Sequence, residues 1–326
     1  MLVYIKPLSM FPKLHSDRLF GAFLSAMNEL YHDKIDEIIN DFRSENPPFL
    51  ISSTFPVLYN DDEKIKFFPK IILNDKIDNS IKQEHIKDFK KVDFVEEKIF
   101  NDILNGRLSQ EDILKDYGDY TRVKNLLMVE DYCNNIDFKV KISPHNSINR
   151  LSNKTRIFYN EGNLFGNNLG LFFFIEIFDT SYSQIIKSCL KFLKDRGFGK
   201  DISTGKGQFD YVIDETESIN FDNEIMQGDK FITLSRFIPS DNDLEFINEE
   251  SSYELGSKRS IDKSGDVRKQ VHFFKEGSTF PHCKKFYGEI IDVGNFKPAI
   301  EYGFAFPIKY GFLGGKWKWL ILKSIQ

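Results

Sequence analysis

The residues best suited to chemistry lie between positions 196 and 209, where four glycines alternate with cations and hydroxyls. Glycine lets a backbone aim several N–H groups at one anion, and lysine adds positive charge. We therefore predict a loop that binds nucleic-acid phosphates. The alternative is a solvated glycine-rich hairpin with no binding function. The candidate residues are Gly197, Gly199, Lys200, Ser203, Thr204, Gly205, Lys206 and Gly207.

Two familiar phosphate motifs do not fit this loop. A Walker A loop has four residues between its first glycine and the Gly-Lys pair, followed by Ser or Thr. Here five residues separate Gly199 from Gly205, and Gly207 follows Lys206. The dinucleotide fingerprint places its glycines before a helix, whereas residues 185–193 are predicted as a helix that precedes them. The pattern argues against a nucleotide triphosphatase and a dinucleotide-dependent enzyme.

A second cluster of polar and basic residues covers positions 138–160, which contain five cations and no carboxylate. Amides, hydroxyls, cations and imidazole suit contacts to the phosphates, sugars and unstacked bases of single-stranded RNA. A solvated hairpin is the alternative. Residues 258–269 are a third basic stretch, which we expect to extend the same RNA-binding surface. The candidates from both stretches are Lys141, His145, Asn149, Arg150, Lys154, Arg156, Arg259 and Arg268.

Catalytic and metal chemistry have weaker support. His15 or His145 has the right titration range for a general base in RNA cleavage, but no spacing identifies a second group to protonate the leaving oxygen. We therefore favour a structural or RNA-contacting role for these histidines. No His/Asp pair has ligand spacing on a helix, and no Cys-x-x-Cys pair occurs. We predict no metal, no cofactor and no disulfide framework.

Charge is unevenly distributed along the 326 residues, whose net charge is −5. Residues 210–254 hold thirteen carboxylates and two cations. This asymmetry indicates a polyanion at one surface and a protein partner, or plain solvent, at another. No apolar run is long enough to cross a membrane, and the first residues lack secretory-signal features, so we expect a soluble cytoplasmic protein with no membrane partner.

Hydrophobic periodicity indicates an α+β fold. Strands are predicted at 2–5, 169–178 and 208–213, with a helix that has Ser16 as its N-cap and another over 182–193. This β-α-β…β-α-β order is the ferredoxin-like signature. Strands at 231–237, 271–274, 287–293 and 302–308 predict a second such half. We expect two ferredoxin-like (RRM-like) domains with antiparallel sheets, residues 1–213, which carry the glycine-rich loop, and residues 214–326.

Four stretches carry a resemblance to a known family. They are residues 14–21 (LHSDRLFG), 144–150 (PHNSINR), the glycine loop, and 274–278 (FKEGS) with 302–305 (YGFA). Together, in this order, they resemble the RAMP superfamily of CRISPR proteins and, more narrowly, the fourth subunit of the type III-A Csm complex. The middle of the chain, residues 61–137, matches no motif.

The resemblance implies a non-catalytic subunit that caps the five-prime repeat-derived handle of the crRNA. It also implies contacts with the large Cas10-type subunit and with the repeated backbone RAMP subunit. By the same resemblance, His15, Ser16 and Arg18 lie beside the glycine loop and join the RNA site. Two alternative functions are open. The first is a RAMP endoribonuclease that processes repeat RNA; in those enzymes the glycine loop lies close to the C-terminus, whereas in this sequence it ends at residue 207 of 326. The second is a scaffold that binds only acidic protein.

Overall fold

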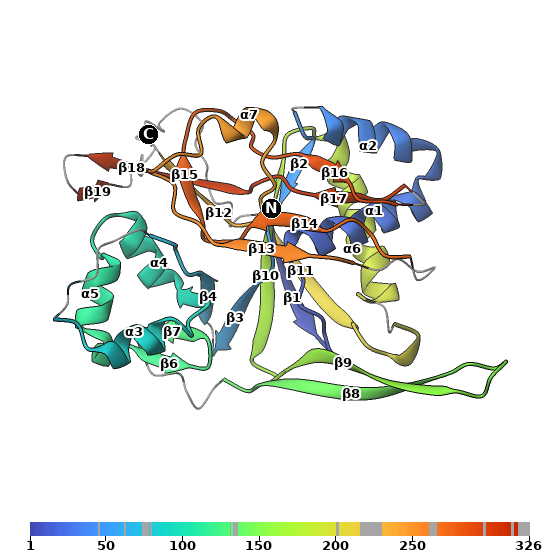
Figure 1. The fold of residues 1–326 in the computed structure, drawn as a ribbon, viewed down its shortest axis with the longest axis horizontal. Helices are drawn as coiled ribbons and strands as arrows, with labels where there is room; N and C mark the ends of the chain where they lie inside the picture. Colours follow the sequence, from blue (N-terminus) through green and yellow to red (C-terminus); the bar gives the residue numbers. More distant parts are fainter. Residues whose placement is uncertain are drawn as a thin grey trace.

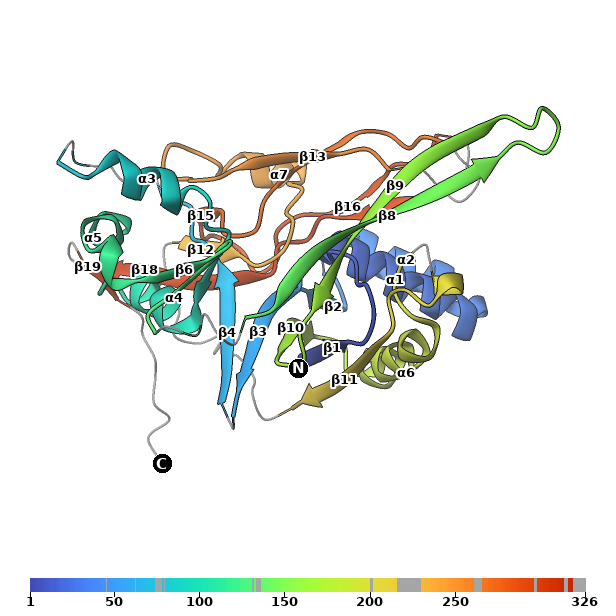
Figure 2. The ribbon, with the colours of Figure 1, turned by 90° about the horizontal axis from the view of Figure 1, so that it is seen from below.

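A central sheet, helices on one face and a long projecting hairpin make up the computed structural model of this chain (Figures 1 and 2). Among the predicted site residues, Lys200 and the side chain of His145 lie outside the described part. The structure describes residues 1–44, 46–61, 63–73, 78, 80–130, 132, 136–199, 202–215, 230–260, 266–295, 298–313 and 316–318.

The central sheet contains nine strands within the described residues, and eight of them follow the order β11-β1-β10-β3-β4-β5-β7-β6, with β2 paired to β10. All of its pairings are antiparallel except β5 with β7. The strands are β1 (Leu2–Pro7), β2 (Phe49–Ile51), β3 (Phe55–Asn60), β4 (Glu63–Pro69), β5 (Phe94–Glu96), β6 (Thr121–Val123), β7 (Leu126–Met128), β10 (Leu169–Ile177) and β11 (Phe209–Asp214).

Two long helices pack together on one face of this sheet, α1 (Ser16–Leu30) after β1 and α6 (Ser181–Arg196) after β10. Helix α1 buries Leu19, Phe20, Phe23 and Met27, whose spacing places them on one side of a helix. A short 3-10 turn (His32–Lys34) leads into α2 (Ile35–Arg43) at the same end of the molecule (Figure 1). The α+β class predicted from the sequence is confirmed.

The segment between β4 and the hairpin forms an insertion at the opposite end of the molecule from α1 and α6 (Figures 1 and 2). Besides β5, β6 and β7 it contains a 3-10 turn (Tyr117–Asp119). Ser109 caps the last of its helices through a capping box with Asp112. The helices are α3 (Gln83–Phe89), α4 (Glu97–Leu104) and α5 (Gln110–Lys115).

The hairpin consists of β8 (Phe138–Ile148) and β9 (Thr155–Phe165), paired along their whole length. Its base joins the body, and its far end projects away from every other element in both views (Figures 1 and 2). Several apolar side chains along it are exposed, including Ile142 and Tyr159. The hairpin therefore gains little from burial against the rest of the chain.

The C-terminal half is rich in short strands. Its described part contains one helix, α7 (Asp241–Leu244), where a β-α-β-β-α-β unit has two. The described part of this half thus contains fewer helices than a complete ferredoxin-like unit, and the second ferredoxin-like domain stays a prediction. The strands are β12 (Lys230–Thr233), β13 (Leu255–Lys258), β14 (Val271–Phe274), β15 (Thr279–Pro281), β16 (Ile290–Asp292), β17 (Ile300–Tyr302), β18 (Pro307–Leu313) and β19 (Lys316–Lys318).

One buried core continues across the predicted domain boundary. Tyr302 stacks on Phe20 of α1 with ring centroids 4.7 Å apart, and its hydroxyl accepts a hydrogen bond of 3.1 Å from the Ile51 amide. Phe306 stacks on Phe174 of the central sheet at 6.0 Å. The two halves of the chain are thus held together by apolar packing. None of the helices in the described ranges has the length and apolar character needed to cross a membrane.

Candidate nucleic-acid interface

The β1–α1 connection, residues 8–15, is the point where the predicted motifs meet. Phe11 exchanges two backbone hydrogen bonds, of 2.8 and 2.9 Å, with Asn163 at the base of the hairpin. The carbonyl of Met10 accepts a 2.9 Å bond from the Gly207 amide. The connection therefore lies between the glycine loop and the hairpin, and its last residue, His15, leads directly into α1.

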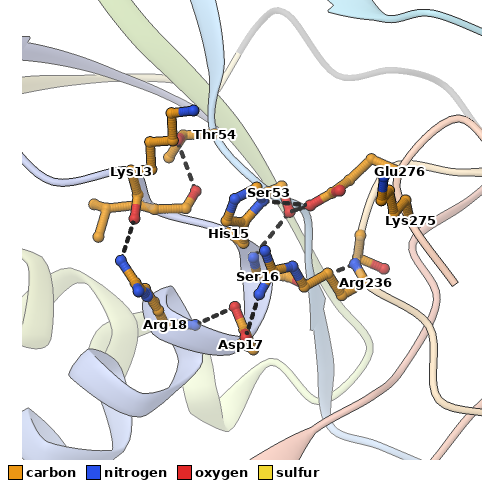
Figure 3. Close-up of polar contacts among 12 residues, drawn as sticks. Lys13, His15, Ser16, Asp17, Arg18, Ser53, Thr54, Arg236, Lys275 and Glu276 are labelled. Atoms are coloured by element: carbon orange, nitrogen blue, oxygen red, sulfur yellow. Dashed lines mark hydrogen bonds and ion pairs between the residues drawn. The ribbon is translucent and has the colours of Figure 1, made fainter. Parts of the chain in front are cut away.

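His15 and Ser16 are held by residues from distant parts of the chain (Figure 3). The Nδ1 atom of His15 lies 2.8 Å from Oε1 of Glu276, and the Ser53 hydroxyl donates to the same oxygen at 2.5 Å. The Ser16 amide in turn donates to Ser53 Oγ at 2.9 Å. Burial is the largest effect on the pKa of Glu276 and would raise it, but the hydrogen bonds from His15 and Ser53 and the charges of His15 and Arg236 together lower the pKa.

Ser16 does not cap α1 as predicted. The helix begins at Ser16 with His15 as its N-cap residue, and the Ser16 hydroxyl accepts a 3.0 Å hydrogen bond from the Arg236 amide instead. The Ser16 hydroxyl is therefore used by a tertiary partner and not by an amide of the first helical turn. Ser16 is fully buried, so it supports the site from within and offers no surface to a ligand.

Asp17 forms a buried ion cluster with Arg236 and Lys258. Its carboxylate lies 2.9 Å from Nη1 of Arg236 and also binds Nζ of Lys258, which lies 2.5 Å from Glu301. Burial alone would raise the pKa of Asp17, but the two cations lower it to about 2. Burial raises the pKa of Glu301. The cluster ties the start of α1 to three separate segments of the C-terminal half.

Arg18 points away from this cluster, toward the carbonyl of Lys13, to which it donates at 3.2 Å (Figure 3). Its side chain is exposed. Of the three residues that the resemblance assigned to this turn, Arg18 is accessible, His15 is half-buried and Ser16 is buried.

The glycines of the 196–209 loop have the conformations that only glycine adopts readily. Gly197, Gly199, Gly205 and Gly207 have φ values of +89°, +106°, +79° and +74°. A Cβ atom on Gly207 would lie 1.8 Å from the Phe198 carbonyl oxygen. The turn closes on Phe198, which is buried.

Several amides in the described part of this loop are engaged within the protein. The N–H of Gly197 donates to Leu193, that of Gly205 to Ile202 and that of Gly207 to Met10. These three N–H groups are consequently not directed at a ligand in this conformation, in contrast to the predicted phosphate cradle. Within the described part of the loop, Ser203 and Thr204 are exposed and carry hydroxyls. Lys206 is half-buried, and a 3-10 turn (Ile202–Thr204) carries the two hydroxyls.

Lys141 and Arg156 lie on the same face of the hairpin as Gly162. Lys141 pairs with Gly162, and Arg156 pairs with Ser147, so these positions share one side of the two strands. Gly162 lies against Met10, since a Cβ there would be 2.6 Å from Met10 Cε. The cationic face of the hairpin therefore begins beside the β1–α1 connection and runs outward from it.

The remaining predicted residues of the hairpin lie near its far end. Asn149 closes the turn, with its Oδ1 accepting from the amides of Leu151 and Ser152 at 3.0 and 3.1 Å. Arg150 and Lys154 are exposed there. His145 pairs with Phe158 along the strands. Because the far end projects from the body (Figure 2), the structure separates these residues from His15.

Arg259 and Arg268 lie on the β13–β14 hairpin of the C-terminal half. Nε of Arg259 donates to the Arg268 carbonyl at 3.2 Å, and the Arg268 amide donates to Ser260 at 2.9 Å. These two hydrogen bonds hold the two arginines close to each other in the C-terminal half. In the described ranges, no three His, Cys, Asp or Glu side chains are grouped as metal ligands would be.

The sequence predictions missed Ser53 and Arg236. Ser53 follows a short apolar strand, and Arg236 stands in an acidic stretch, so neither has a local signal. Glu276 and Asp17 were part of family-like stretches but had no assigned role. Their importance comes from contacts across more than 200 positions in sequence, such as the 219 between Asp17 and Arg236.

Residues 226–310 match the family model of the CRISPR Csm4 C-terminal domain. The predicted resemblance to Csm4 is thereby confirmed. A comparison with curated protein sequences gave no match.

The fold is also similar to chains in solved structures of Csm4-containing complexes, over more than nine-tenths of this chain. A chain of a Csm3–Csm4 subcomplex of the type III-A CRISPR-Cas interference complex superposes with a TM-score of 0.66 at 18% identity, covering 92% of this chain and 98% of that one. A chain of a Csm1–Csm4 cassette in complex with cA4 has a TM-score of 0.53 at 18% identity, covering 94% and 97%. At these identities the likeness establishes a shared fold.

Proposed function

We propose that this chain is a non-catalytic RNA-binding subunit of a type III-A CRISPR (Csm) complex that holds the five-prime repeat-derived handle of the crRNA. One observation carries the proposal: three of the stretches that resemble the family, residues 14–21, the glycine loop and residues 274–278, meet around the β1–α1 connection. Gly207 bonds to Met10, Asn163 to Phe11, and Glu276 to His15. Family-like stretches that are distant in sequence but adjacent in the fold are what we expect of one binding surface.

The accessible groups of this surface suit RNA. Arg18, Lys141 and Arg156 supply positive charge, and Ser203 and Thr204 supply hydroxyls that hydrogen-bond to phosphate or ribose oxygens. Because the amides of Gly197, Gly205 and Gly207 are engaged in the fold, we expect side chains to make most of the phosphate contacts in this loop. Phosphate contacts of this kind make affinity depend steeply on salt.

The partner assignment is part of the same proposal. We expect the chain to connect a large Cas10-type subunit with a backbone RAMP subunit, in the cytoplasm. The likeness to chains of Csm1–Csm4 and Csm3–Csm4 assemblies supports this expectation. The exposed carboxylates Asp241, Glu245, Glu249 and Glu250 are candidates for docking a protein partner.

At the level of the fold, we propose that residues 1–213 form a ferredoxin-like RAMP domain with insertions. The strand order β11-β1-β10-β3, with α1 after β1 and α6 after β10, supports this proposal. In such a unit β8 and β9 are an elaboration between the second and third strands. Residues 214–326 would then be a second domain that shares its core with the first.

Binding and cleavage, measured in the same samples, test the proposed function. The purified chain with its complex partners is titrated with RNA that carries the repeat handle and with RNA in which the handle is scrambled, at several salt concentrations. Tighter, salt-sensitive binding of the intact handle without cleavage is expected. Cleavage at one repeat position would instead identify a processing endoribonuclease, with the His15–Glu276 pair as its first candidate base. Equal affinity for both RNAs would reject handle recognition.

A further inference from the structure

The central sheet ends on one side at β11, which is a regular edge strand of six residues. It pairs with β1 without interruption, from Phe209 opposite Pro7 to Asp214 opposite Leu2. β11 comes first in the strand order, at the margin of the sheet in Figure 2, and no other described strand pairs with its outer side. The strand at the other end of the order, β6, has only three residues and carries Arg122. In the described part of the chain, β11 is therefore the edge at which the central sheet can best be extended.

Pro7 determines which backbone groups of β11 face outward. Proline has no N–H, so Pro7 and Phe209 cannot exchange two hydrogen bonds, and in an antiparallel ladder bonded and non-bonded pairs alternate. The neighbouring pair agrees with this phase, because the Leu8 amide donates to the Gln208 carbonyl at 2.8 Å. The even-numbered residues of β11 therefore bond to β1. The N–H and C=O groups that face outward belong to Phe209, Tyr211 and Ile213, and within the described residues no backbone hydrogen bond outside the strands uses them.

β11 lacks the features with which folded proteins protect an exposed edge. Protected edges are short, or they carry proline, lysine or a bulge. The sequence of β11, FDYVID, has neither proline nor lysine, and its pairing with β1 has no bulge. Val212 is 64% exposed on one face of the strand, and Tyr211 and Ile213 are half-buried against the core on the other. Unpaired backbone groups beside exposed apolar side chains favour pairing with a further strand.

The chemistry of this edge fits a protein strand. An extended backbone supplies N–H and C=O groups in the alternation that the outward groups of β11 require. Phosphates accept hydrogen bonds but donate none, so a row of phosphates would leave the outward C=O groups unpaired. A second copy of this chain fits less well than a different protein, because joining two β11 strands would gather four carboxylates on one face, Asp210 and Asp214 of each copy. The occupant that fits best is an extended segment of another protein.

We propose that β11 is a strand-addition site, at which an extended segment of a partner subunit pairs with the outward backbone groups and prolongs the central sheet. The side chains of the added strand alternate between the two faces, and those on the face of Tyr211 and Ile213 are apolar because they continue the partly covered core there. The inference rests on the proposed partner assignment and deepens it, since it names the element and the type of contact. The glycine loop leads directly into β11, so a strand added there also stabilises that loop.

Amide hydrogen exchange of the wild-type chain tests this pairing without any substitution. In the free monomeric chain, the amides of Tyr211 and Ile213 are expected to exchange fast and that of Val212 slowly, because only Val212 bonds to β1. In the complex assembled from this chain, the Cas10-type subunit and the backbone RAMP subunit, exchange at Tyr211 and Ile213 is expected to slow by about tenfold or more. Fast exchange at both amides in the complex would overturn the proposal. Slow exchange already in the free monomer would also overturn it, since the chain would then cover its own edge.

Proline at position 211 removes one outward donor and no hydrogen bond to β1. Tyr211→Pro is expected to bind the partner subunit about tenfold more weakly than Tyr211→Ala, because it lacks one intermolecular hydrogen bond. Tyr211→Ala is the matched control, since it loses the same ring but keeps the N–H. Equal affinities of the two variants would contradict strand addition. If Tyr211→Pro alone has a lower thermal unfolding midpoint, the exchange measurement on the wild type decides.

The outcomes separate this inference from the proposed function. If the complex assembles and binds handle RNA while the amides of Tyr211 and Ile213 still exchange fast, the proposed function stands and the assignment of β11 is wrong. If the chain assembles with neither subunit, the partner assignment fails and this inference fails with it. Slowing that depends on the concentration of the chain alone would identify a second copy as the occupant, and slowing on addition of RNA to the free chain would identify RNA. Either result overturns the assignment to a partner subunit.

Discussion

The carboxylate of Asp17 and the guanidinium of Arg236 lie 2.9 Å apart although 219 positions separate them in the sequence. Asp17 begins α1, next to His15 and Ser16, and Arg236 belongs to the C-terminal half. The amide of Arg236 also donates to the Ser16 hydroxyl at 3.0 Å. The turn that carries the family motif is thus positioned by the C-terminal half of the chain, through charge and through backbone hydrogen bonding.

Replacing Asp17 by Asn should destabilise the protein strongly. The change leaves two cations, Arg236 and Lys258, beside a neutral amide in a buried site, which costs about 3–5 kcal/mol of unfolding free energy. Urea denaturation measures the loss. The matched control is Asp292→Asn, which removes an exposed ion pair with Arg43 that also connects the two halves. We expect Asp292→Asn to lower the unfolding free energy by less than about 1 kcal/mol. Equal losses in the two variants would contradict the prediction that the buried cluster contributes more than the exposed pair.

The contribution of Asp17 should also depend on pH. Its pKa is lowered to about 2 in the folded protein, whereas an unfolded aspartate titrates near about 3.9. The stabilisation is therefore complete above about pH 5 and declines as the pH falls through these values. The difference in unfolding free energy between the wild type and Asp17→Asn should shrink between about pH 5 and pH 3. A constant or growing difference would show that Asp17 is not the titrating group.

Substitution by alanine should reduce the stability of the protein to different extents at two glycines of the glycine loop. Gly205 and Gly207 both have positive φ, so each substitution incurs backbone strain of about 1–2 kcal/mol. At Gly205 the added Cβ meets no atom within 4 Å, whereas at Gly207 it would lie 1.8 Å from the Phe198 carbonyl. Gly207→Ala should therefore be clearly less stable than Gly205→Ala in thermal unfolding. Similar midpoints would mean that the loop tolerates rearrangement around Phe198.

Cations on the hairpin should contribute to RNA affinity through charge. Removing Lys141 and Arg156 together should weaken binding of any single-stranded RNA and lower the salt slope by about two, because each cation that contacts a phosphate releases about one counterion. Filter binding at several salt concentrations measures both quantities. Lys115→Ala, which removes a cation of the insertion paired with Glu111, is the control and should change neither. An unchanged slope in the hairpin variant would place the RNA elsewhere.

Local signals in the sequence predicted much of the scaffold. The apolar spacing of Leu19, Phe23 and Met27 predicted α1, and the continuous apolar run at 169–178 predicted β10, because both patterns depend on neighbours a few positions away. The glycine loop was also located, since positive φ at Gly205 and Gly207 requires glycine whatever surrounds it. These features are determined by the chain itself.

The tertiary structure decided which partners the polar groups of these elements bind. Ser16 had the sequence of an N-cap but accepts its hydrogen bond from Arg236, and the Gly207 amide looked available for phosphate but donates to Met10. Such pairings join groups that the sequence keeps far apart, and hydrogen-bond partners depend on distances of about 3 Å that no periodicity encodes. The sequence by itself thus determined the elements and the family motifs. Only the folded arrangement decided which of their polar groups remain available to a ligand.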